Sequence, residues 1–277
     1  MAPMSKTLAP STAVTSRDPK GLKFMSIVEA QYNKAGMSDK EAQRVNNTAG
    51  LADLVDDFIS KNRVTDQFKD EEVASTYGYP SGYTKPKGIT EQTNILRQIF
   101  PGVGFADEKL AEGAVSANAE GWFAIPRWQT IAPTYSEAVQ KVFDALKKAR
   151  NGKFYNYREG QLGPKQLRQS AKCVEMFQKL GDEQTGYDIL IVASQFGKRH
   201  AGRSVRRARE VMLDNGNEFG LGAFAVGVML LTHPERLQHL DDLWIDCAGD
   251  EFDEPGSAVR FDRSPFFDWD VGRVEFD

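Results

Sequence analysis

The longest apolar stretch of the chain runs from Phe219 to Leu231 and carries no charged or polar side chain. It has 13 residues, three of them glycine, whereas a helix that crosses a bilayer needs roughly 20. Because this segment has no polar face, it is stable in water only when other parts of the chain bury it on every side. We therefore expect a globular fold and no membrane partner.

The elements around this stretch alternate between strand and helix patterns. The most strand-like segment is Asp188 to Ser194, DILIVAS, whose aliphatic and β-branched residues are typical of a strand covered on both faces. A helix capped by Thr134 has apolar residues three or four positions apart. Further strand patterns lie at residues 122–128, 154–159, 243–248, 259–261 and 274–276, and further helical patterns begin near residues 38, 51, 90 and 164. This alternation predicts an α+β fold, with a helical N-terminal unit followed by a mixed domain in which a small sheet is packed by helices.

Composition along the chain predicts three parts. Residues 1–23 are rich in Ser, Thr, Pro and Lys and predict a disordered leader. Residues 24–120 form the helical unit, and residues 121–277 form the mixed α/β domain with an acidic C-terminal segment. Two cysteines, Cys173 and Cys247, are too few for a disulfide framework and favour a reducing compartment, so we expect a cytoplasmic protein.

Charge is unevenly distributed along the chain. The formal total is −4, from 35 Lys and Arg against 39 Asp and Glu, which excludes a polybasic nucleic-acid coat protein. Residues 153–209 hold twelve cations against five acids, a sum of +7, whereas residues 241–277 hold three against twelve, a sum of −9. The basic segment therefore either binds an external anion or is neutralised by the acidic C-terminal segment.

The basic segment is densest in and after the loop GKRHAGRS, Gly197 to Ser204, which follows a predicted strand and precedes a predicted helix. Glycines in such a loop let backbone N–H groups approach phosphate oxygens, and a helix N-terminus favours negative charge. Six cations fall within the twelve residues from Lys198 to Arg209. The candidate phosphate- or anion-binding residues are Gly197, Lys198, Arg199, Gly202, Arg203, Ser204, Arg206 and Arg207.

The loop has the register G-x-x-x-x-G-R-S, which resembles the P-loop pattern of nucleotide triphosphatases with Arg203 in place of the family's lysine. The segment IDCAGDE, Ile245 to Glu251, resembles the D-x-x-G segment of GTPases, in which Asp246 would contact magnesium. No base-reading N-K-x-D or T-K-x-D motif follows Asp246. The resemblance implies a degenerate nucleotide hydrolase that uses this loop and Asp246.

Two further features could extend a nucleic-acid surface. A predicted helix from Pro164 to Gly181 carries cations that fall on one side at 100° per residue, forming a basic stripe of Lys165, Arg168, Lys172 and Lys179. The loop YGYPSGYTKPKG interleaves aromatic rings with lysines, as base stacking on a single strand requires. Its candidate stacking residues are Tyr77, Tyr79 and Tyr83.

These observations leave three hypotheses. The first is a non-catalytic module that binds nucleic acid or a phosphate-bearing ligand through the basic strand–loop–helix element. The second is a structural or interaction protein, with a protein partner, whose basic loop is neutralised by its own acidic C-terminal segment. The third is the P-loop-like hydrolase. No motif assigns a catalytic residue, a metal site or a cofactor.

Overall fold

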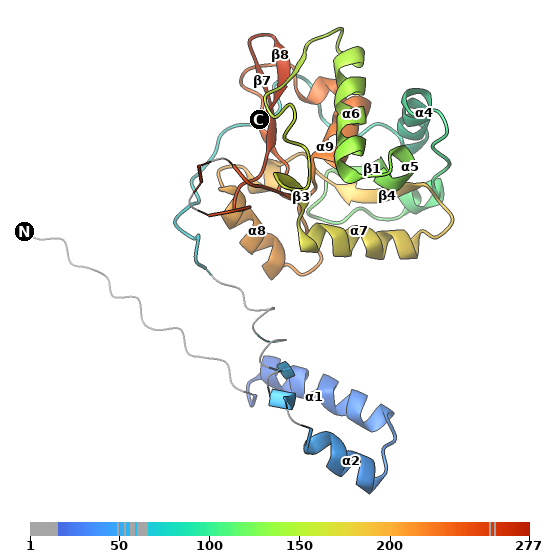
Figure 1. Ribbon diagram of the computed structural model, residues 1–277, viewed down its shortest axis with the longest axis vertical. Coiled ribbons are helices and arrows are strands. Elements are labelled where there is room, and N and C mark those ends of the chain that lie inside the picture. The colour runs from blue at the N-terminus through green and yellow to red at the C-terminus, as the bar shows by residue number, and fades with distance from the viewer. Residues whose placement is uncertain are drawn as a thin grey trace, which may run out of the picture. The chain divides into compact units, whose positions relative to one another are not determined.

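The computed structural model describes residues 16–48, 50–52, 54–55, 59, 66–254, 256–257 and 259–277 of the 277 (Figure 1). These residues have an α+β fold, which confirms the fold class predicted from the sequence. The chain divides into two compact units, Met1–Arg63 and Val64–Asp277. In the described part of the chain, no helix is both long enough and apolar enough to span a membrane.

The smaller unit contains helices α1 (Pro19–Lys34) and α2 (Asp39–Asn46). The Glu41 carboxylate accepts a hydrogen bond from the Ser38 backbone N–H at 2.9 Å, so the predicted start of α2 is confirmed. The leader expected over residues 1–23 is described only from residue 16, and its last five residues belong to α1. Phe58, which belongs to the helical pattern that begins near residue 51, lies outside the described residues.

The larger unit holds the remaining elements. Its helices are α4 (Ile89–Ile99), α5 (Trp128–Ile131), α6 (Tyr135–Ala149), α7 (Ala171–Glu183), α8 (Val205–Asp214) and α9 (Ala223–Thr232), with 3₁₀ turns η1 (Glu108–Glu112), η2 (Lys198–His200) and η3 (Pro234–Arg236). Its strands are β1 (Gly121–Pro126), β2 (Phe154–Asn156), β3 (Leu167–Gln169), β4 (Ile189–Ser194), β5 (Ile245–Asp246), β6 (Asp250–Phe252), β7 (Phe266–Asp270) and β8 (Arg273–Phe276).

The described strands form three small sheets where the sequence predicted one. Strands β1 and β4 form an antiparallel pair, with Phe123 opposite Val192. A four-stranded sheet has the order β2-β8-β7-β5, in which β2 runs parallel to β8, and β3 pairs with β6. The domain boundary expected at residue 121 falls on the first residue of β1, which packs against α4 within the larger unit.

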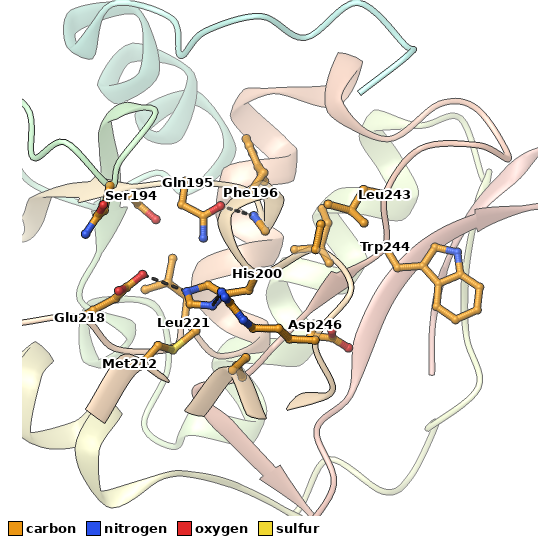
Figure 2. A pocket seen from close by; sticks show the side chains of 18 of the residues that line it. Ser194, Gln195, Phe196, His200, Met212, Glu218, Leu221, Leu243, Trp244 and Asp246 are labelled. Carbon is orange, nitrogen blue, oxygen red and sulfur yellow. Dashed lines mark hydrogen bonds and ion pairs between the residues drawn. The ribbon is translucent and has the colours of Figure 1, made fainter. Parts of the chain in front are cut away.

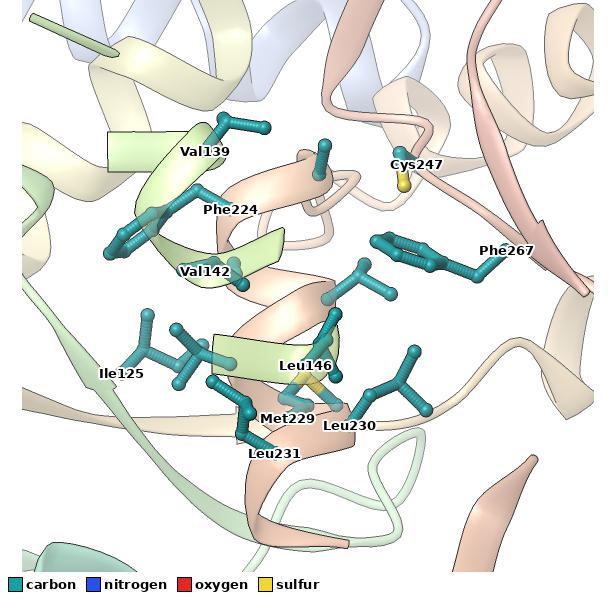
Figure 3. Close-up of a cluster of buried hydrophobic side chains, with 14 of the residues drawn as sticks. Ile125, Val139, Val142, Leu146, Phe224, Met229, Leu230, Leu231, Cys247 and Phe267 are labelled. Atoms are coloured by element: carbon teal, nitrogen blue, oxygen red, sulfur yellow. The ribbon is translucent and has the colours of Figure 1, made fainter. Parts of the chain in front are cut away.

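The apolar stretch from Phe219 to Leu231 contains most of α9, and every residue of this helix is buried (Figure 3). Helix α6 packs across it, and a Cβ on Gly227 would lie 2.5 Å from Val142 Cγ1. The two helices therefore approach each other at a position without a side chain. Ile125 of β1 and Phe267 of β7 belong to the same buried cluster, so α9 joins two of the sheets into one core.

Three local predictions from the sequence were wrong. The helix expected from Pro164 begins at Ala171 instead, because Leu167 enters the core and its strand β3 pairs with β6. The strand expected at residues 259–261 is a turn, with Phe261 at a φ of 59°. The strand expected at 243–248 is reduced to the two residues of β5.

Candidate functional site

A cavity of about 1100 Å³ opens in the larger unit (Figure 2). Sites for small organic molecules usually have roughly 300–1,000 Å³, so the cavity is large enough for such a ligand. Apolar residues of α8 and α9 form part of its wall. The rest of the wall comes from residues 73–77, 116, 118, 119, 192–197, 200–203, 215, 217–221, 240, 241, 243–246 and 248.

The basic loop predicted from the sequence forms part of this wall. It connects β4 to α8, so the expected strand–loop–helix arrangement is present. The Ser204 hydroxyl accepts a hydrogen bond from the Arg207 N–H at 3.1 Å and caps α8. Gly197 and Gly202 both have positive φ, at 104° and 84°, which explains the need for glycine at these positions.

Seven of the eight backbone N–H groups of this loop donate hydrogen bonds within the chain. The Lys198 N–H donates to the Tyr79 hydroxyl at 3.0 Å, and the Ser204 N–H donates to the Glu71 carbonyl at 3.0 Å. The N–H groups of further loop residues are bonded in the same way, namely those of Gly197, Arg199, His200, Ala201 and Arg203. A phosphate cradle needs several of these donors to be free, so this conformation does not form one.

Gly202 is approached closely by the protein's own backbone. A Cβ at this position would lie 2.1 Å from the Val73 carbonyl oxygen, and the Val73 N–H donates to the Gly202 carbonyl at 2.8 Å. The glycine predicted to admit a phosphate instead admits the chain around Val73.

The arginines of the cluster are ion-paired with an acidic strap, which we define as residues 66–72. Arg203 pairs with Glu72 at 2.7 Å, and Arg206 pairs with Glu71. Arg207 pairs with both Asp66 at 3.1 Å and Glu72 at 3.2 Å. In addition, Glu210 of α8 accepts hydrogen bonds from two N–H groups of the strap, those of Gln67 and Phe68.

The two remaining cations of the predicted site differ from each other. Arg199 pairs with Glu218 at 2.8 Å. Lys198 has no carboxylate partner among the described residues, and its Nζ lies 5.9 Å from the centre of the Tyr79 ring. The loop is therefore largely neutralised from inside the protein.

The acidic C-terminal segment neutralises different arginines. Arg168 pairs with Glu251 at 2.8 Å, and Arg158 pairs with Asp277 at 2.7 Å. Internal neutralisation of the basic loop was expected from this segment, whereas the ion pairs of Arg199, Arg203, Arg206 and Arg207 in the described residues use other carboxylates.

The four residues of the predicted basic stripe do not lie on one helix. Lys165 precedes β3 and Arg168 lies on it, whereas Lys172 and Lys179 lie on α7. The Arg168 guanidinium also stacks 3.8 Å from the centre of the Phe261 ring. The stripe was derived from helical spacing over residues 164–181, but the helix begins only at Ala171, so the structure does not reproduce the geometry of the stripe.

The three candidate stacking tyrosines are in different environments. Tyr83 is 4% exposed and belongs to the core. Tyr79 donates a hydrogen bond to Glu120 at 2.6 Å, and its ring lies 3.9 Å from the buried guanidinium of Arg236. Tyr77 is 61% exposed and lines the cavity, so it alone of the three offers an open ring.

A histidine and a glutamate meet on the cavity wall. His200 Nε2 lies 2.9 Å from Glu218 Oε1, and its Nδ1 lies 3.3 Å from a guanidinium nitrogen of Arg203 (Figure 2). Because a guanidinium only donates, Nδ1 accepts and the Nε2–H donates to Glu218. Burial lowers the pKa of His200, although the bond to Glu218 opposes the shift. The imidazole is therefore held neutral in one tautomer.

Asp246 lies at the end of β5, and its side chain is open to the cavity (Figure 2). Its carboxylate has no hydrogen bond or ion pair with any described residue. Surrounding protein replaces part of its hydration and raises the pKa of Asp246 to about 6, against a smaller opposing effect of the Arg209 guanidinium. The sequence identified this aspartate as a magnesium contact, but β5 and β4 belong to different sheets, unlike the adjacent parallel strands of a P-loop site.

Sequence reasoning missed the strap and Glu218. The run Asp70, Glu71 and Glu72 was a detectable signal, because it is a local concentration of charge opposite in sign to the loop. Glu218 had no comparable signal, since it is an isolated acid after α8. The described residues contain no group of three His, Cys, Asp or Glu side chains that could hold a metal ion. No protein-family model matches this chain, and neither does any curated protein or solved structure.

Proposed function

We propose that this chain binds a small, largely apolar organic molecule in the cavity. The observation that carries the proposal is a space of about 1100 Å³ with a wall that is more apolar than polar. Each 40 Å² of apolar ligand surface removed from water contributes about 1 kcal/mol, so a ligand that fills part of the cavity is held chiefly by contact with this wall. The apolar side chains of the wall include those of Val192, Phe196, Met212, Leu221, Val226, Met229 and Leu243.

The polar groups of the wall would orient the ligand. The neutral His200 is fixed by Glu218 and Arg203, and Asp246 has no partner in the described chain. A few fixed polar groups within an apolar wall are typical of sites that bind a particular molecule, because each such group selects an orientation.

A neutral fluorescent probe tests this proposal directly. N-Phenyl-1-naphthylamine should bind the full chain saturably, with one probe per chain and increased emission. Ala201→Trp, which places an indole in the cavity wall, should weaken this binding at least tenfold. Ala171→Trp is the matched control, because Ala171 is exposed at the start of α7 and does not line the cavity. Equal binding by the two folded variants would show that the cavity is not the site.

A second candidate function is favoured by the concentration of cations around the start of α8. We propose that a nucleic acid or another phosphate-bearing polyanion binds Lys198, Arg203, Arg206 and Arg207 in competition with the acidic strap. Lys198 has no carboxylate partner in the described part of the chain, and the Arg206 side chain is 46% exposed. Phosphates would exchange with the strap carboxylates as partners for the guanidinium groups.

Fluorescence anisotropy with a labelled single-stranded oligonucleotide tests this second function. Binding should be measurable at low salt and should weaken steeply as the salt concentration rises. Glu71→Gln should tighten it, because one internal competitor is removed, and Arg206→Ala should weaken it. Glu175→Gln on α7 is the control for the loss of one acid elsewhere. No binding at low salt, by either the parent chain or Glu71→Gln, would overturn the proposal.

A further inference from the structure

The charged side chains that line the cavity in the described part of the chain are Arg203, Glu218, Asp241 and Asp246. Arg203 is paired with Glu72 and Glu218 with Arg199, whereas the side chain of the rim residue Asp241 is 73% exposed, so water compensates its charge. Asp246 lines the same cavity and has no such partner in the described chain. An ionised carboxylate without a partner on the wall is a site of uncompensated negative charge.

Strand pairing fixes the backbone at Asp246. Asp246 pairs with Phe266 of β7, and the next residue donates its N–H to the Pro265 carbonyl at 2.8 Å. Because the backbone is already ordered, a ligand that binds Asp246 has to order only this short side chain, so little ordering of the protein opposes binding.

Arg209 is the cation that acts on the pKa of Asp246, but its guanidinium forms hydrogen bonds with other groups. The Arg209 guanidinium donates to the backbone carbonyls of Ala248 at 3.0 Å and of Asp250. It lowers the pKa of Asp246 without forming an ion pair with it, and the resulting pKa of about 6 leaves the carboxylate mainly ionised at pH 7.5. The charge is thus available to a ligand at neutral pH.

We propose, on the basis of the cavity function proposed above, that the ligand carries a protonated basic nitrogen that forms an ion pair with the Asp246 carboxylate. The ligand class is an amine with an apolar or aromatic body. The same arrangement disfavours anionic ligands, because the cationic groups of the wall are already compensated and the free charge is negative. This separates the cavity ligand from the phosphates considered for the basic loop.

Three indole probes that share one apolar body test the proposal: tryptamine carries an ammonium, tryptophol a hydroxyl and indole-3-acetate a carboxylate. Isothermal titration with the full chain at pH 7.5 should give the tightest binding for tryptamine. It should bind about tenfold more tightly than tryptophol, as expected for one charge-assisted hydrogen bond in a partly exposed site. Indole-3-acetate should bind most weakly.

Asp246→Asn keeps the size of the side chain and removes its charge. This variant should bind tryptamine only as tightly as tryptophol, and its affinity for tryptophol should be nearly that of the parent chain. Asp214→Asn is the control, because this exposed aspartate at the end of α8 does not line the cavity. A circular dichroism spectrum establishes that each variant is folded.

The outcomes separate this inference from the function on which it rests. If the neutral naphthylamine probe binds in the cavity but tryptamine has no advantage over tryptophol, or keeps it in Asp246→Asn, the amine proposal is overturned and the cavity function stands. If neither the naphthylamine probe nor any indole probe binds, both proposals are overturned.

Discussion

Gly227 lies where α6 and α9 approach each other, and a methyl group there would overlap Val142. We expect Gly227→Ala to lower the free energy of unfolding by about 1–3 kcal/mol, because a well-packed core accommodates an extra carbon only by shifting its neighbours. Urea denaturation followed by circular dichroism measures the change. Gly78→Ala is the control, since a Cβ at Gly78 meets nothing within 4 Å. Equal stabilities of the two variants would contradict the expectation.

Asp250 is the first residue of β6, and its buried carboxyl group lies at the N-terminus of α9. Its Oδ2 accepts a hydrogen bond from the Ala223 N–H at 2.7 Å, and the Tyr135 hydroxyl lies 2.8 Å from both oxygens. Burial is the main cause of a pKa raised to about 7, which these hydrogen bonds only partly oppose. Folding therefore takes up a proton here when the pH lies between the unfolded pKa, about 3.9, and about 7.

This proton uptake predicts a pH dependence of stability. Because the folded state binds more protons than the unfolded state, the contribution of Asp250 to the free energy of unfolding falls as the pH rises from about 4 to about 7 and is constant above that. Subtracting the stability of Asp250→Asn from that of the parent chain at each pH cancels the groups that both proteins share. A difference that rises with pH over this window would contradict the assignment.

At the scale of elements, the acidic strap is held to the basic loop by ion pairs that water and salt can reach. The Glu71 side chain is 30% exposed and that of its partner Arg206 is 46% exposed. Glu71→Gln should therefore lower the free energy of unfolding by only about 0.5–1 kcal/mol. Since salt screens exposed pairs, the difference from the parent chain should shrink at high ionic strength.

Thermal denaturation at low and high salt measures this effect. The control is Glu175→Gln. Glu175 pairs with Lys172 on the same helix at 3.4 Å, but the Glu175 side chain is 68% exposed. This variant should change stability less than Glu71→Gln does. A difference for Glu71→Gln that is independent of salt would show that the strap is held by contacts other than ion pairs.

Elements with a strong local signal were predictable, and those decided by partners distant in sequence were not. Thr134 caps α6 as predicted, because its hydroxyl and the Glu137 N–H are three residues apart and need no other segment. Strand β3 was missed, because its pairing with β6 joins Leu167 to Phe252 and overrides the helical spacing of residues 164–181. A single sequence contains the local capping signal but does not show which distant strand a segment pairs with.

At the scale of the whole molecule, the division into two compact units makes a prediction about folding. A chain of residues 64–277 should unfold cooperatively, with the same thermal midpoint as the full protein, because the described core belongs to this unit. Differential scanning calorimetry of both chains measures the midpoint. A clearly lower midpoint for the shorter chain would show that residues 1–63 stabilise the larger unit.

The candidate site was predictable only in part, because the partners of its charged residues are distant in sequence. The sequence identified the loop from Gly197 to Ser204 and also Asp246, and both line one cavity. It could not show that the loop's arginines are paired with residues 66–72, because charge patterns give the sign of a segment but not its partner. Cytoplasmic location and a protein partner stay predictions.

The strap carboxylates are far from their arginine partners in the sequence. Glu72 and Arg203 are 131 residues apart, and Glu71 and Arg206 are 135 residues apart. During translation, the acidic residues leave the ribosome long before those arginines have been made. The nascent chain therefore carries an unmatched negative segment until most of the protein has been synthesised, and closing so long a loop comes late. Order of synthesis thus makes docking of this segment one of the last steps of maturation.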